Sequence, residues 1–159
     1  MKKTFLLIII LLAGGVVFSQ SADVITDLLE SDEATFGQVS YLAAVQMNLL
    51  DENESYENAV KALVENNIIP DDEDADTPIP LVDIAYIYSK LWDVKGGLMY
   101  RITKGSPRYA FRQFQSDGVI SSDADPAWHV SGAKALSIFT SCVNKYSGFD
   151  MNSVSMEVE

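Results

Sequence analysis

The sequence predicts a mostly α-helical protein, built as repeated helix–loop–helix hairpins in one compact domain. Shifted by 51 residues without a gap, one block falls on another, so that Ile79 meets Val130 and Tyr88 meets Phe139. Within each block, apolar residues recur with the spacing of one helix face. Repetition at a fixed period is typical of an array of similar units. The blocks add up to about two and a half hairpins.

The N-terminus predicts a secretory signal peptide over residues 1–21. Two lysines precede an apolar stretch from Phe5 to Val17, and small residues follow at Ser19 and Ser21. This order of a basic start, an apolar stretch and small residues is typical of a cleaved signal. The stretch is short for a membrane-spanning helix. We therefore expect export to the periplasm or the cell surface, with no membrane insertion after cleavage.

The rest of the chain divides into a short N-terminal segment, a helical repeat domain and a flexible tail. These parts cover residues 22–34, 35–146 and 147–159. The domain contains the second half of a repeat (35–54), two full repeats (55–92 and 106–146) and a connector (93–105). Apolar spacing predicts helices over 23–30, 36–50, 56–65, 81–92, 108–115 and 131–146. The helix over 81–92 is apolar on most sides and is expected to be the most buried.

Polar residues at the expected helix ends support these boundaries. Thr35 and Gln38 have the form of a capping box. Ser55 and Ser131 are suitable N-caps, and Pro107 suits a first helical turn. In the connector, a pair of glycines precedes residues 98–103, which we expect to be a short strand or an irregular segment.

The charge of the chain limits its partners. Eleven Lys and Arg oppose 23 Asp and Glu, a net charge of −12. This excludes a nucleic-acid partner, which needs a basic surface, and disfavours docking on an anionic membrane leaflet. A single cysteine, Cys142, permits no internal disulfide and is expected to be buried. No phosphate-binding glycine loop, nucleophile motif or zinc motif is present, so we expect no enzymatic activity and no obligatory cofactor.

Two clusters are candidate sites, and the first is acidic. Asp72, Asp74, Asp76 and Asp83 occupy positions 1, 3, 5 and 12 of a calcium-binding loop. Position 6 is Thr77, where such loops need glycine for a sharp turn. The alternatives are therefore weak calcium binding and a solvated acidic loop.

The second cluster is basic and lies around the connector. Arg101, Arg108 and Arg112 are interleaved with Tyr100 and Tyr109. Such a patch on an acidic body can bind an anion or a partner protein. The alternative is that these arginines pair internally with the acidic loops.

The pattern resembles the S-layer homology modules of exported bacterial envelope proteins over residues 35–146. The shared features are a helix that begins with an aromatic residue and is followed by a short apolar segment, then an acidic loop and a second helix. These features are found in segments 56–69, 79–85, 109–120 and 130–134, and segment 35–38 resembles the remnant of an earlier copy. The resemblance implies a helical repeat fold and association with the cell envelope. The family's Thr-Arg-Ala-Glu box has no arginine in any copy here, so the ligand is not carried over.

These observations lead to a functional hypothesis. We expect an exported, non-enzymatic interaction or scaffold module whose partner is an envelope protein or a glycan. A calcium-dependent binding or structural module, built on the loop from Asp72 to Asp83, is the alternative.

Overall fold

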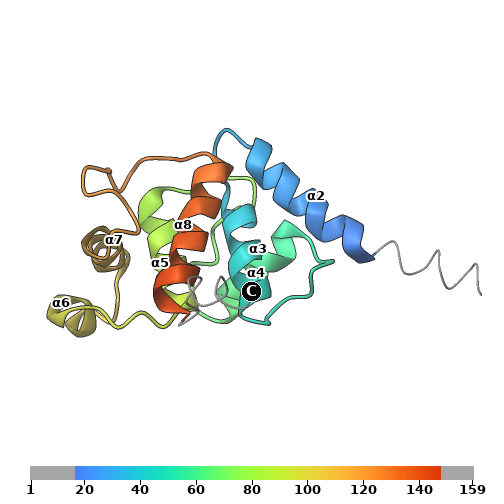
Figure 1. The fold of residues 1–159 in the computed structure, drawn as a ribbon. Helices are drawn as coiled ribbons and strands as arrows, with labels where there is room; N and C mark the ends of the chain where they lie inside the picture. Colours follow the sequence, from blue (N-terminus) through green and yellow to red (C-terminus); the bar gives the residue numbers. More distant parts are fainter. Residues whose placement is uncertain (1–16, 148–159) are drawn as a thin grey trace, which may run out of the picture.

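The computed structural model describes residues 17–147, with side chains from Asp23 onward. This part of the chain contains seven helices and no strand (Figure 1). The helices are α2 (Val17–Glu30), α3 (Phe36–Gln46), α4 (Tyr56–Glu65), α5 (Leu81–Leu91), α6 (Leu98–Ile102), α7 (Pro107–Ser116) and α8 (Gly132–Tyr146). Most of the expected signal peptide and nearly all of the expected tail lie outside the described residues. The prediction of a mostly helical, compact protein is confirmed.

Four predicted helices, α4, α5, α7 and α8, agree with the structure within one residue at each end. The polar residues and the proline expected at the starts of α3, α4, α7 and α8 are also found there. Thr35 and Gln38 form a complete capping box at the start of α3. The hydroxyls of Ser55 and Ser131 accept from backbone amides at the starts of α4 and α8. Pro107 begins α7. The hydroxyl caps occupy amide groups that have no partner within the helix itself, and Pro107 has no amide hydrogen that needs a partner.

The predicted helix over 36–50 is too long, because α3 ends at Gln46. Asn48 has a φ of 55°, in the left-handed region. The amide of Leu49 then donates to the carbonyl of Ala44 at 2.9 Å, which closes the helix end. A left-handed asparagine after the last turn is a common helix stop.

Residues 98–103 are not a strand, since Leu98–Ile102 form the short helix α6. A helix of five residues has little stability of its own. Here the side-chain oxygen of Gln113, on α7, accepts from the amide of Gly97 at 3.0 Å and fixes the start of α6. This contact between distant parts of the chain explains why local sequence does not predict the helix.

The most buried helix is α3 rather than α5. Nine consecutive residues of α3, from Phe36 to Ala44, are buried, whereas six residues of α5 are buried. The loop that precedes α5 covers the start of α3, where the amides of Phe36 and Gly37 donate to the carbonyls of Thr77 and Ala75. None of the described helices combines the length and apolarity needed to cross a membrane.

The helices pack in three pairs, α3 with α4, α5 with α7, and α2 with α8. Three backbone hydrogen bonds link the first residue of a helix to a loop elsewhere: Phe36 N to Thr77 O (2.9 Å), Leu81 N to Trp128 O (2.9 Å) and Gly132 N to Ser31 O (3.0 Å). The acceptor loops precede α5, α8 and α3 respectively. The start of α3 is thus bonded to the loop before α5, the start of α5 to the loop before α8, and the start of α8 to the loop before α3. The three hydrogen bonds form a closed cycle.

Candidate functional site

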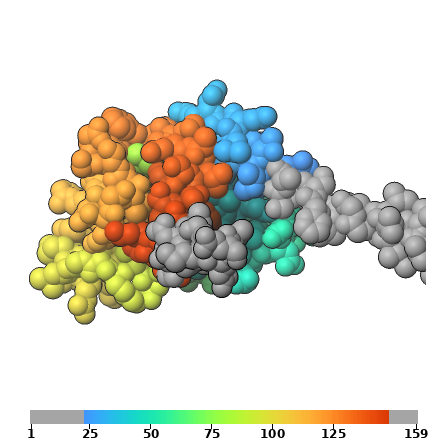
Figure 2. Space-filling model, in the orientation of Figure 1, coloured from blue at the N-terminus to red at the C-terminus, as the bar shows by residue number. Residues whose placement is uncertain are grey.

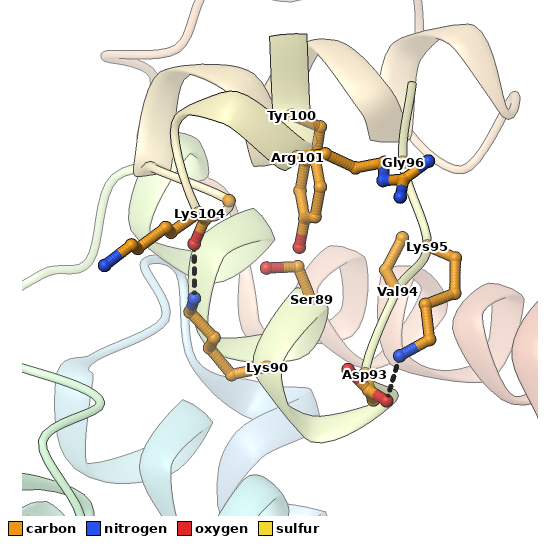
Figure 3. Close-up of a pocket in the computed structure, with 10 residues that line it drawn as sticks. Ser89, Lys90, Asp93, Val94, Lys95, Gly96, Tyr100, Arg101 and Lys104 are labelled. Atoms are coloured by element: carbon orange, nitrogen blue, oxygen red, sulfur yellow. Dashed lines mark hydrogen bonds and ion pairs between the residues drawn. The ribbon is translucent and has the colours of Figure 1, made fainter. Parts of the chain in front are cut away.

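A cleft of about 680 Å³ lies between the end of α5 and the helix α6 (Figure 3). Four cationic residues line it, namely Lys90, Lys95, Arg101 and Lys104, together with the half-buried Tyr100. They come from α5, from the segment that follows it, and from α6 and its C-terminal turn. We call this the cationic cleft.

The ring of Tyr100 is held in the cleft by two glycines. A Cβ atom on Gly96 would lie 2.4 Å from Tyr100 Cγ, and one on Gly105 would lie 2.7 Å from its Cζ and hydroxyl oxygen. Gly105 also has a φ of 67°, which favours glycine. The aromatic ring therefore lies against bare backbone on both sides, and any side chain at either position would push it away.

Lys90 connects α5 to the turn after α6. Its ammonium group donates to the carbonyl oxygen of Lys104 at 2.9 Å (Figure 3). The same group lies 5.0 Å from the centre of the Tyr86 ring. This contact fixes the end of α6 while it keeps a positive charge at the edge of the cleft.

The positive charge of the cleft is mostly unneutralised. Lys95 pairs with Asp93, and the other approach of a basic to an acidic side chain within residues 17–147 is that of His129 Nδ1 to Glu33, at 3.8 Å. Within that range, Arg101 and Lys104 form no ion pair with a carboxylate. The expected alternative, internal pairing of the arginines with acidic loops, is therefore not found among the described residues. Such a cleft is suited to hold an oxyanion.

The basic residues expected to act together are divided between two clefts. Arg108 and Arg112 line a separate cleft of about 490 Å³, with Phe111 and Pro126 among its apolar walls. Tyr109 is half-buried on α7 and lines neither cleft. Of the five candidate residues, Tyr100 and Arg101 are thus brought together, and the other three lie apart from them.

The acidic candidates do not converge. Asp72, Asp74 and Asp76 are exposed, and a carboxylate oxygen of Asp74 accepts from the amide of Asp76 at 2.9 Å. Asp83 instead lines a third cleft, of about 420 Å³, with Glu73. Between residues 17 and 147, no group of three or more acidic, histidine or cysteine side chains is arranged to hold a metal ion. Calcium binding by this loop remains a prediction.

The carboxyl groups of Asp83 and Glu73 share an environment that disfavours ionisation. Burial raises the pKa of Asp83. Burial, and then the charges of Asp72 and Asp83, raise the pKa of Glu73. These two groups could accept a hydrogen bond or a cation from a ligand, but they line a cleft separate from the cationic one.

Lys90 was missed as a site residue in the sequence. It belongs to α5, whereas the predicted basic cluster lies around the connector 93–105. The available signal was the basic residue in the last turn of the helix, where a cation is favourable to the helix dipole. A count of charges from residue 90, rather than from 95, would have included it.

No family model, curated protein or solved structure matches this chain. The fold and the site define it as a compact, mostly helical protein that carries a cationic cleft on an acidic body.

Proposed function

We propose that this protein is an exported, non-enzymatic interaction module of the cell envelope that binds anionic groups of its partner in the cationic cleft. The observation that carries the proposal is the convergence of Lys90, Lys95, Arg101 and Lys104 on one cleft. An envelope protein or glycan that carries carboxylate or phosphate groups has the required chemistry.

The distribution of charge along the chain supports this proposal. Residues 90–112 contain six of the 11 basic residues and one of the 23 acidic residues. The rest of the chain therefore carries almost all of the negative charge. Repulsion by the acidic body would keep an anionic partner away from other surfaces and leave the cleft as the favoured contact.

We also propose that the fold is a set of three helix–loop–helix copies, namely α2–α3, α4–α5 and α7–α8. The support is the closed cycle of hydrogen bonds from Phe36, Leu81 and Gly132. Each of these residues begins the second helix of one copy, and each donates to the loop before the second helix of another copy. The packing of α2 against α8 puts the first copy beside the last. In this arrangement α2 supplies the first helix of the earliest copy, in agreement with a likeness to S-layer homology modules.

The test is binding of a small soluble anion, for which inorganic tripolyphosphate is a suitable probe. We expect saturable binding by calorimetry at low ionic strength, weakened as salt rises because exposed charges are screened. Arg101→Gln combined with Lys104→Gln should weaken binding by about tenfold or more.

The matched control combines Lys61→Gln with Lys134→Gln, which makes the same change in net charge at exposed positions outside the cleft. Equal weakening in this control would show only a general effect of charge and would contradict the proposal. Absence of binding to the wild-type protein would contradict it as well.

A further inference from the structure

Helix α6 exposes three large apolar side chains. Leu98, Met99 and Ile102 are 73%, 50% and 65% exposed. In the described part of the chain, five large apolar residues are exposed, and three of them belong to this five-residue helix. Leu98 and Ile102 are four residues apart and therefore neighbours on one helix face. A contiguous apolar patch of this kind marks an interaction surface more often than a single exposed residue does.

The fold holds this patch outward. The start of α6 is fixed by the hydrogen bond between Gln113 and Gly97, and the turn after it by the hydrogen bond between Lys90 and Lys104. Tyr100 points into the cleft, as Figure 3 shows, and its ring lies against Gly96 and Gly105. The same helix therefore directs its half-buried tyrosine into the cleft and leaves its aliphatic residues in solvent.

Cations surround the patch. Arg101 lies within α6, Lys95 precedes it and Lys104 follows it, and all three are exposed. An apolar centre with a basic border is complementary to the interface of an anionic bilayer, where acyl chains lie beneath negatively charged headgroups.

We propose that α6 is a docking surface for an anionic lipid bilayer, in which the apolar side chains enter the headgroup layer and the cations of the cleft contact lipid phosphates. This inference rests on the proposed function of the cationic cleft and assigns its anionic groups to lipid, in place of a protein or glycan. The shape of the molecule favours lipid over an acidic protein. The segment around α6 forms a corner at the lower left of the space-filling view (Figure 2). A projecting corner enters a soft headgroup layer directly, whereas a protein partner must supply a matching groove.

The net charge of −12 predicts repulsion from such a bilayer, but the local distribution gives the opposite expectation. At physiological ionic strength, exposed charges farther apart than about 8 Å are largely screened. The cleft beside α6 is lined by four basic residues and one acid, Asp93. Contact through α6 would bring these cations to the bilayer surface.

The test is co-sedimentation with vesicles of phosphatidylcholine, pure or with about a third phosphatidylglycerol. We expect the wild-type protein to bind the anionic vesicles only. Combined substitution of Leu98→Gln, Met99→Gln and Ile102→Gln should weaken this binding by about tenfold or more, because the buried apolar area is lost. All variants share the same N-terminus, so any contribution of its apolar stretch cancels in the comparison.

The control combines Leu29→Gln with Trp128→Gln, two exposed apolar residues outside α6. It should bind the anionic vesicles as the wild type does. A wild-type protein that stays in the supernatant, a triple variant that binds normally, or a control that loses equal affinity would each overturn the inference.

Tripolyphosphate binding separates this inference from the proposed function. The triple α6 variant should still bind tripolyphosphate, since its cleft cations are intact. Tripolyphosphate binding without vesicle binding would support the cationic cleft as an anion-binding site but overturn the lipid assignment. The anionic partner would then be an acidic protein or a glycan.

Discussion

Gly132, the first residue of α8, lies directly against the backbone carbonyl of Leu28 in α2. A Cβ atom at position 132 would lie 1.8 Å from that carbonyl oxygen. The amide of Gly132 also donates to the carbonyl of Ser31 at 3.0 Å. The first and last described helices are therefore joined backbone to backbone, and only glycine permits the approach.

The first prediction follows from this contact. Gly132→Ala should lower the free energy of unfolding by about 2–3 kcal/mol, because the added methyl group must force α2 and α8 apart. Urea unfolding followed by circular dichroism measures the change. Gly97→Ala is the control, since a Cβ there meets only the side-chain oxygen of Gln113, at 4.0 Å. Equal stability of the two variants would show that the helices do not pack as described.

The second prediction concerns Cys142, which is fully buried in α8. Burial raises the pKa of its thiol. The reactive species is the thiolate, and a buried neutral thiol is inert. At pH 8 the native protein should react with a thiol reagent about 100-fold more slowly than the urea-unfolded chain. A native rate close to the unfolded rate would place Cys142 at the surface. Denaturing in urea and repeating the assay provides the reference within one sample.

The third prediction concerns pH and the carboxyl group of Asp83. Burial raises its pKa above the ordinary value of 3.8, so ionisation costs stability in the folded state. That cost is absent below about pH 3.8, appears as the pH rises through the folded pKa, and is complete at neutral pH. Asp83→Asn should therefore raise the melting temperature at pH 7 and lose this advantage at pH 3.

The exposed Asp76 supplies the control for this comparison. Asp76→Asn removes the same charge where burial is absent, and its effect should be smaller and should vary less with pH. If Asp83→Asn were destabilising at pH 7, its carboxylate would be stabilised by the fold rather than penalised by it.

Helix positions follow from the sequence where local chemistry decides them. The Thr35 capping box and the Ser55 and Ser131 caps define helix starts within a few residues, and the apolar spacing defines the bodies. The end of α3 and the existence of α6 were predicted wrongly. The left-handed turn at Asn48 does not follow from the apolar pattern, and α6 depends on Gln113 from another helix.

The candidate site could be predicted only in part, because packing between helices decides which side chains meet. Composition identifies a basic region, and Tyr100 and Arg101 are indeed found together in one cleft. Whether two basic residues share a cleft depends on how α5, α6 and α7 cross. This packing adds Lys90 to the cationic cleft and assigns Arg108 and Arg112 to another.

The fourth prediction concerns the hydroxyl group of Tyr88. Its side chain is completely buried, and its oxygen has no hydrogen-bond partner among the described residues. The ring makes edge-to-face contacts with Trp92 and Phe139, at centroid distances of 5.9 Å and 5.4 Å. Phenylalanine keeps these contacts and removes an unsatisfied polar group. Tyr88→Phe should therefore leave stability unchanged or raise it by about 1 kcal/mol.

Tyr41 offers the matched comparison, because its hydroxyl donates to the carbonyl of Glu52 at 2.7 Å. Tyr41→Phe removes one made hydrogen bond and should cost about 1 kcal/mol. Urea unfolding of both variants against the wild type measures the difference. A larger loss in Tyr88→Phe than in Tyr41→Phe would mean that the buried hydroxyl is satisfied in solution, either by a water molecule or by a part of the chain outside residues 17–147. The sign of the difference thus tests whether the aromatic contacts between α5 and α8 are held by apolar packing alone.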